Sequence, residues 1–347
     1  MITPNFFDAK NSADYHYQPN QRQLLLDAEG YRSDNSITSA ITDRMKVNLL
    51  LIDLQRDFCF PEGSLYVAGQ SGNGAIEDST RISQFIYQNM NQISQITTTL
   101  DTHFAVQIFF PFFWVDENGA NPEPHTVITA DDIRKGVYKP NPAIVAAAVG
   151  NKDAYPWLLQ YVIHYCEQLE ADGKYQLYLW PEHCLIGSDG HVLTGVIHEA
   201  RLFHSFVRGT QSLCEIKGGN PLTENYSILR PEVLTRHDGQ PLAQKNTTFI
   251  NTLLKNDRVI IAGQAASHCV ASSIDDLLEE IKAVDPELAQ KVYVMEDCMS
   301  SVTVPDGQGG FVADFTPQAD TALQRYRDAG MHVVKSTEFG NWADFEL

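Results

Sequence analysis

Short apolar runs alternate with amphipathic stretches along most of this chain. Nearly continuous apolar segments such as 47–54 and 257–263 are typical of strands that are buried on both faces. The segments predicted as strands are 47–54, 93–100, 213–216, 257–263, 292–295 and 331–334. The segments predicted as helices are 76–90, 156–170, 270–281 and 316–328.

This alternation predicts the fold class. Strands that alternate with helices form a parallel sheet with helices on both faces. We therefore expect an α/β three-layer sandwich with a mostly parallel central sheet and large insertions. In such sheets ligands bind outside the carboxyl ends of the strands, and Asp53, Asp101, Lys217 and the turn 264–269 all fall at such ends.

The first and middle segments interrupt the regular pattern. Residues 1–45 are polar and carry only short apolar pieces, so we expect an N-terminal extension that packs on the domain or mediates assembly. Residues 46–340 are predicted to form the main domain. Within it, the segment at about 104–210, with its aromatic run and its Pro-rich turn, is interpreted as an insertion over the site. A separate small domain is the alternative.

The acidic composition limits the possible partners. The formal net charge is −19 over 347 residues, which disfavours nucleic acid and anionic membranes because both are bound by clustered Lys and Arg. No apolar run approaches the ~20 residues of a membrane span, and the first residues do not resemble a signal peptide. We expect a cytoplasmic protein that takes a small-molecule substrate and forms a homo-oligomer.

One of the six scattered cysteines is a candidate nucleophile. The absence of CxxC pairs is typical of reduced thiols. Cys269 follows a strand and a short turn and opens a helix. A helix N-terminus stabilises a thiolate, and the backbone N–H groups of such a turn can hold an oxyanion. The position alone leaves two interpretations open, a nucleophile and a buried structural thiol.

Asp101 and His103 are candidate metal ligands. They stand two residues apart just past a strand, where regular strand geometry would place both on one face. A carboxylate and an imidazole suit a divalent metal ion. Taken alone, the pair is better explained as two polar residues in a loop.

Four segments, in order along the chain, resemble the isochorismatase-like cysteine hydrolases, and the nicotinamidases in particular. They are 50–69 (LLIDLQRDFCFPEGSLYVAG), 180–184 (WPEHC), 215–218 (EIKG) and 262–270 (AGQAASHCV). The resemblance spans about 47–335, with long insertions. It implies an isochorismatase-like fold and an amide hydrolase with a cysteine nucleophile.

The resemblance implies a catalytic triad. Cys269 would be the nucleophile, and Asp53 would be the general base that later protonates the leaving amine. Lys217 would face both, and its charge would help to hold the thiolate. The N–H groups of Ala265 and Cys269 would form the oxyanion hole.

The resemblance also implies substrate contacts and one backbone feature. Phe58, Trp180 and Gln264 would line the substrate pocket. The family's non-proline cis peptide bond would fall at Gln264–Ala265. His268 is expected to orient this turn rather than bind a metal.

With the resemblance, His183 joins Asp101 and His103 as a third metal ligand. Three such ligands with open positions suit one divalent ion, with Zn²⁺ as the first choice and Fe or Mn as alternatives. Some relatives have a further His shortly after the D-x-H, but here an aromatic run takes that place. His125 could substitute across the inserted loop, but we expect it to be dispensable.

The expected activity is hydrolysis of nicotinamide to nicotinate and ammonia. The alternatives are a related amidase acting on another small carboxamide or carbamoyl compound, and a non-catalytic member that binds a metabolite or a partner. The isochorismate-cleaving relatives lack the cysteine, so Cys269 argues against that branch. Metal-free amidases of the fold lack the D-x-H, so Asp101 and His103 argue against those.

Overall fold

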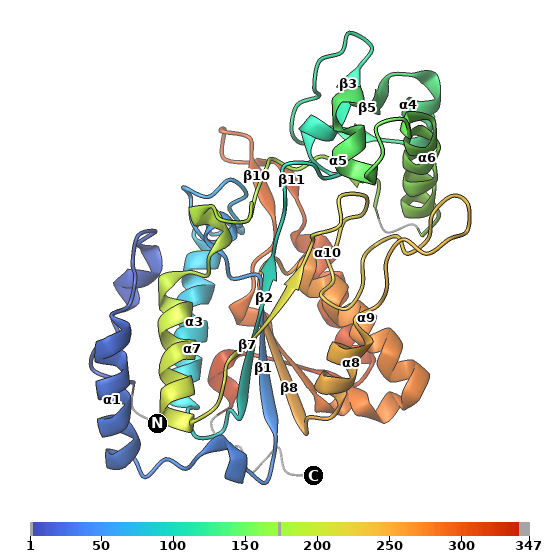
Figure 1. The fold of residues 1–347 in the computed structure, drawn as a ribbon. Helices are drawn as coiled ribbons and strands as arrows, with labels where there is room; N and C mark the ends of the chain where they lie inside the picture. The colour runs from blue at the N-terminus through green and yellow to red at the C-terminus, as the bar shows by residue number, and fades with distance from the viewer. Residues whose placement is uncertain (1–2, 173–174, 340–347) are drawn as a thin grey trace.

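A six-stranded sheet forms the centre of the computed structural model, which describes residues 3–172 and 175–339 (Figure 1). The strand order is β12–β9–β8–β1–β2–β7. The strands are β1 (Val47–Ile52), β2 (Gln95–Asp101), β7 (Leu213–Lys217), β8 (Arg258–Gly263), β9 (Val292–Met295) and β12 (His332–Val334). Every neighbouring pair is parallel. All six carboxyl ends therefore lie at one edge of the sheet.

The central strand β1 shows how the sequence creates three layers. All of its residues are buried. Leu49 and Leu51 join the apolar core on one face, whereas Leu50 and Ile52 join the core on the other face. Successive side chains of a strand point to opposite faces, so a continuous apolar run requires a cover on both. The expected three-layer α/β fold is confirmed.

Helices on both faces supply these covers (Figure 1). Helices α3 (Gly74–Gln88) and α7 (Gly195–Arg208) pack together on one face, with α1 (Gln21–Asp34) outside α7. On the other face lie α8 (Thr247–Leu254), α9 (Cys269–Val284) and α10 (Thr316–Asp328). The sequence pattern predicts α3, α9 and α10 but not α1, α7 or α8.

The N-terminal segment, described from residue 3 onward, lies against the α3–α7 layer. Phe6 packs on Phe203 of α7 with ring centroids 5.0 Å apart, and the Tyr17 hydroxyl donates to Glu199 of α7. Leu24 of α1 is buried in the same core. The polar N-terminal segment therefore completes the outer cover of this face.

Additional structure lies above the carboxyl ends of the strands, at the upper right of Figure 1. It contains two short antiparallel strand pairs, β3 with β5 and β4 with β6. Its elements are β3 (Trp114–Asp116), β4 (Val127–Ile128), α4 (Ala130–Lys135), β5 (Tyr138–Pro140), α5 (Val145–Val149), α6 (Tyr155–Asp172) and β6 (Leu177–Tyr178). Helix α7 falls inside the range expected for the insertion but packs on the main sheet layer. The added structure thus ends before Gly195.

The remaining elements are short. A hairpin pairs β10 (Thr303–Pro305) with β11 (Phe311–Asp314). One further α-helical turn is α2 (Arg56–Cys59), and the 3₁₀ turns are η1 (Ala9–Ala13), η2 (Ala40–Thr42), η3 (Pro111–Phe113), η4 (Pro142–Ile144), η5 (Asp189–His191), η6 (Pro286–Lys291), η7 (Glu296–Cys298) and η8 (Ser336–Glu338). Among the described residues, no helix has both the length and the apolar character needed to cross a bilayer.

Candidate active site

The carboxyl ends of four adjacent strands meet at one site. Ile52 at the end of β1 pairs with Gly263 at the end of β8. Asp101 at the end of β2 pairs with Lys217 at the end of β7. Asp53 follows β1 directly, and the turn after β8 leads to Cys269. The fold therefore brings the three triad residues of the sequence analysis together.

Lys217 links the charged groups of this site. Its Nζ lies 2.9 Å from Asp53 Oδ2 and 2.9 Å from Asp101 Oδ1. It also donates to the Asn225 carbonyl at 2.9 Å and to Cys269 Sγ at 3.7 Å. Burial lowers the pKa of this amine, but the two carboxylates outweigh burial and hold the pKa well above its ordinary value. Lys217 is therefore a fixed cation beside the thiol.

Cys269 is the first residue of α9 and is buried. Burial raises the pKa of its thiol well above the ordinary value, the Lys217 charge opposes this rise, and Asp53 adds to it. Burial thus favours the protonated thiol, whereas the helix N-terminus and Lys217 favour the thiolate. A base must take the proton as the sulfur reacts.

Asp53 has the surroundings of such a base. The residue is fully buried and has a left-handed backbone φ of 47° just past β1. Its N–H donates to Thr99 Oγ1 at 3.0 Å, and the Thr99 hydroxyl donates to Asp53 Oδ1. Burial raises the pKa of the Asp53 carboxyl, with Lys217 opposing. A carboxylate of raised pKa beside a buried thiol can accept its proton.

The turn between β8 and α9 offers two backbone donors. Its Gln264–Ala265 peptide bond is cis, as the resemblance implies. Within residues 3–172 and 175–339, the N–H groups of Ala265 and Cys269 donate to no acceptor. Both residues line the cavity beside the thiol. Their N–H groups can therefore stabilise an oxyanion that forms there.

The Gln264 side chain serves the turn and does not reach the cavity. Its amide donates to Asp78 Oδ2 at 2.8 Å, and its Oε1 accepts from the Ser300 N–H at 3.2 Å. Both ends of the amide are thus engaged behind the turn. Gln264, expected from the sequence to contact the substrate, is thus held by Asp78 and Ser300 and is not among the residues that line the cavity.

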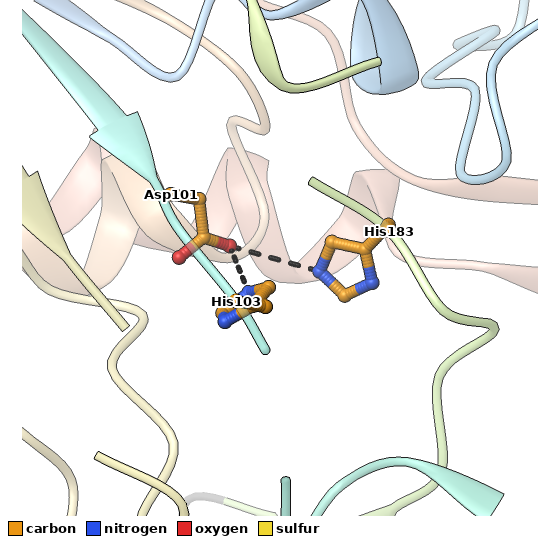
Figure 2. A group of neighbouring side chains, drawn as sticks. All are labelled: Asp101, His103 and His183. Atoms are coloured by element: carbon orange, nitrogen blue, oxygen red, sulfur yellow. Dashed lines mark hydrogen bonds and ion pairs between the residues drawn. The ribbon is translucent and has the colours of Figure 1, made fainter. Parts of the chain in front are cut away.

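Asp101, His103 and His183 meet at one wall of the same cavity (Figure 2). Asp101 Oδ2 lies 2.8 Å from His103 Nε2 and 3.6 Å from His183 Nε2. One potential ligand atom from each residue lies within 4.8 Å of the other two. All three residues are buried.

Hydrogen bonds behind the two imidazoles determine which ring nitrogen is free. His103 Nδ1 lies 3.2 Å from the Gly218 carbonyl, and His183 Nδ1 lies 2.8 Å from the Pro181 carbonyl. A carbonyl can only accept, so the tautomer that donates from Nδ1 to this carbonyl presents a lone pair on Nε2. Two lone pairs then converge with a carboxylate oxygen. Three converging acceptors without a proton between them fit a bound cation.

Gly218 makes room for this group. Its φ is +88°, and a Cβ at this position would lie 2.6 Å from His103 Cε1 and 2.7 Å from Asp101 Oδ1. Only glycine adopts this backbone conformation freely and avoids both contacts. Because Gly218 has no side chain, its carbonyl can approach and orient His103.

Phe58 and Trp180, the other expected substrate contacts, line the cavity. The Phe58 ring lies 5.5 Å from the His183 ring, measured between centroids. The Trp180 Nε1–H donates to Tyr226 at 2.9 Å and to Glu224 Oε1 at 3.0 Å. The aromatic walls and the three metal-ligand candidates thus share one space.

Sequence reasoning missed Glu224 and Tyr226, which also line the cavity. Glu224 is 5% exposed, and its Oε2 has no hydrogen-bond partner among the described residues. Burial raises the pKa of this carboxyl well above its ordinary value. Both residues lie in the irregular segment after β7, where no periodicity marks them. Their proximity to the EIKG segment was the only available signal.

The two other histidines considered from the sequence lie outside the metal-ligand group. His125 is exposed, and its Nδ1 lies 3.0 Å from the Tyr178 hydroxyl. His268 directly precedes α9, and its Nδ1 lies 2.9 Å from Ser267 Oγ. Burial lowers the pKa of His268 to about 4, so its ring is neutral.

Comparison with known proteins adds to this geometry. No family model matches the chain. A nicotinamidase of Escherichia coli strain K12 is 26% identical over 141 residues, which cover 39% of this chain and 52% of that protein. The chain thus spans about half the length of the curated relative that it matches.

Solved structures match over a larger share of the chain. An Acinetobacter baumanii nicotinamidase/pyrazinamidase superposes with a TM-score of 0.50 at 19% identity, covering 86% of this chain and 100% of that one. A yeast nicotinamidase bound to the inhibitor nicotinaldehyde has a TM-score of 0.49 at 19% identity, covering 83% and 99%. The chain therefore has the isochorismatase-like α/β fold and resembles the nicotinamidase-related hydrolases that share it.

Proposed function

We propose that this protein is a metal-assisted cysteine amidohydrolase, and that its substrate is a small planar carboxamide such as nicotinamide. The products would be nicotinate and ammonia. The observation that carries the proposal is the contact of Lys217 with both Asp53 and Cys269. Cys269 lines the same cavity as Asp101, His103 and His183. A nucleophile, a base and a fixed cation at one point are the requirements for acyl transfer through sulfur.

The reaction begins with the neutral thiol. Cys269 Sγ attacks the amide carbon while its proton passes to Asp53, and the carbonyl oxygen becomes an oxyanion held by the N–H groups of Ala265 and Cys269. Asp53 then gives the proton to the amide nitrogen. The C–N bond breaks, ammonia leaves, and the acyl group remains on sulfur as a thioester.

Water completes the cycle. Asp53 takes a proton from a water molecule that attacks the thioester carbon, and the C–S bond breaks to release the carboxylic acid. The proton returns to the sulfur. Throughout, Lys217 keeps its charge between Asp53 and Asp101 and offsets negative charge that develops on Cys269.

Asp101, His103 and His183 are the residues that would hold a divalent ion, with zinc as the first choice and iron or manganese as alternatives. When bound, the ion supplies a Lewis acid that anchors a ring nitrogen and orients the ring. Phe58 and Trp180 line the same cavity and would contact that ring. The expected site in the cell is the cytoplasm.

Ammonia release by the purified protein tests the proposal directly. We expect turnover of nicotinamide, weaker turnover of benzamide because it lacks the ring nitrogen, and loss of turnover in Cys269→Ala. A panel of carbamoyl compounds run in parallel tests the related amidases. Absence of ammonia from every amide, with the metal site loaded, would contradict the proposed function.

A further inference from the structure

A larger groove lies beside the catalytic cavity. It is bounded by α10, the start of α9 and the added strands β4 and β6, with Ala322, Ser272, Val127 and Tyr178 among its walls. Its volume is about 620 Å³, whereas the free volume of the catalytic cavity is about 30 Å³. The second value leaves room for about two water molecules.

Three rings separate the groove from the catalytic cavity, because Trp180, Tyr226 and His268 line both spaces. The His268 ring lies 5.4 Å from Trp180 and 5.5 Å from Tyr226, measured between centroids. Trp180 Nε1 and the Tyr226 hydroxyl are 2.9 Å apart. The rings thus form a continuous partition one side chain thick.

The free volume of the catalytic cavity is small, so we expect this partition to shift when a substrate ring enters. A ring ligand needs several times the space of one water molecule. Trp180, Tyr226 and His268 have open groove on their far side, so their displacement joins the two spaces. Whatever extends from the bound ring then reaches the groove.

The structure also indicates which end of the amide can be extended. In the proposed reaction the leaving nitrogen takes its proton from Asp53. This residue is 0% exposed and contacts Lys217 and Thr99. A bulky group on that nitrogen would collide with these buried residues. The amine must therefore be small, and any extension must belong to the acyl group.

The groove walls suit an uncharged extension. Val127, Tyr178 and Phe315 give apolar and aromatic surface, and Ser272 and Thr321 add hydroxyl groups. The charged wall residues Arg325 and Asp275 neutralise each other, with Arg325 Nη2 2.6 Å from one carboxylate oxygen and 2.7 Å from the other. The described groove walls therefore carry no unpaired charge that would bind a charged ligand group.

We propose that this groove is a second substrate subsite, which takes an apolar or aromatic extension on the acyl group of a primary carboxamide. This inference rests on the proposed cysteine amidase function. It makes the preferred substrate larger than nicotinamide, with the scissile amide at Cys269 and the distal part of the acyl group between α10 and β6.

Kinetics with paired substrates test the subsite. We compare 5-phenylpyridine-3-carboxamide, extended on the acyl side, with nicotinamide and with N-benzylnicotinamide, extended on the amine side. The wild type should show a kcat/KM for the phenyl compound about tenfold or more above nicotinamide and no turnover of the N-benzyl compound. A preference for nicotinamide over the phenyl compound, or hydrolysis of the N-benzyl compound, would overturn the inference.

Thr321→Trp fills the groove from α10. It should lower kcat/KM for the phenyl compound about tenfold more than for nicotinamide. Gln324→Trp is the matched control, because Gln324 is exposed on the same helix and lies outside the groove lining. It should leave the ratio of the two substrates unchanged. Equal effects of Thr321→Trp on both substrates would count against the subsite.

Binding to Cys269→Ala separates this inference from the proposed reaction. Calorimetry with the phenyl compound requires no turnover. Binding that weakens about tenfold in the Cys269→Ala/Thr321→Trp double variant supports the subsite even if the wild type releases no ammonia. Failure of the phenyl compound to bind Cys269→Ala refutes the subsite even if nicotinamide is hydrolysed.

Discussion

At the scale of single residues, the site depends on one sulfur atom among six cysteines. Replacement of Cys269 by Ala should lower turnover by about a thousandfold or more, because the covalent step is lost. The fold should persist, since the change removes only a sulfur atom from a buried position. Cys214→Ala is the control because Cys214 is an exposed thiol. Circular dichroism and ammonia release measure the two properties, and full activity in Cys269→Ala would exclude the mechanism.

The two charged neighbours of Cys269 should affect its thiol in opposite directions. Lys217 lowers the pKa of the thiol, whereas Asp53 raises it. Lys217→Met should therefore slow iodoacetamide alkylation at pH 8 about tenfold, and Asp53→Asn should accelerate it by a similar factor. Both variants should lose turnover, because Asp53 moves the proton and Lys217 holds the charge.

Mass spectrometry of the labelled peptide across pH 7 to 10 measures these rates. Lys282→Met removes an exposed lysine from the same helix that Cys269 opens, and it should leave the alkylation rate unchanged. Alkylation that changes in the same direction in Lys217→Met and Asp53→Asn would show that the charges do not act on the thiol as described.

At the scale of elements, the turn after β7 shapes the metal-ligand group. A Cβ on Gly218 would meet both His103 and Asp101, whereas a Cβ on Gly219 would have its nearest neighbour at 3.9 Å. Gly218→Ala should therefore weaken metal binding about 10- to 100-fold, and Gly219→Ala should not. Elemental analysis and metal titration check this.

Histidine variants give the reference points for that experiment. His183→Ala removes one of three potential ligands and should abolish stoichiometric metal. His125→Ala should retain metal because His125 faces Tyr178 instead. Metal that survives in His183→Ala but disappears in His125→Ala would reverse the ligand assignment.

The same scale shows how far the sequence predicts this fold. Nearly continuous apolar runs predict β1, β8 and β9 well because burial on both faces leaves few polar positions. Helix α1 escapes prediction because only Leu24 and Ala28 of it are buried. Helix α7 carries a clear apolar stripe. It follows a long irregular segment, so the sequence does not indicate that it returns to the main layer.

The site was predictable wherever a strand end fixes a residue. Asp101 and Lys217 end strands and Asp53 directly follows one, so their convergence is implied by the parallel order. The orientation of Gln264 and the presence of Glu224 depend on loop paths that local pattern does not encode. The raised pKa of the Cys269 thiol depends on how deeply the whole fold buries it.

At the scale of the whole molecule, buried neutral histidines make stability depend on pH. His204 of α7 is fully buried and donates from Nε2 to the Ile93 carbonyl at 2.9 Å. Burial lowers its pKa from 6.5 to about 4. The unfolded chain therefore binds a proton between these values that the folded chain does not, so stability falls as pH drops from 6.5 to 4, by about 3 kcal/mol.

Urea unfolding between pH 7 and pH 4 measures this loss. His204→Gln keeps a donor near the Ile93 carbonyl but cannot titrate, so its unfolding free energy should depend on pH with a slope smaller by about one proton. Other buried histidines keep part of the slope. An unchanged slope in His204→Gln would mean that His204 is protonated in the folded protein.

The position of β7 at the edge of the sheet has a consequence for how such a protein can diversify. Strands β2 and β7 are the last two strands at one edge of the sheet, and the chain segments that follow them both supply walls to the site. Lengthening either excursion remodels what can approach Cys269 while the inner strands β1 and β8 keep their register. Substrate range and catalytic chemistry are thus encoded in separable stretches of chain, so new specificities can arise through insertion at this edge without rebuilding the reactive centre.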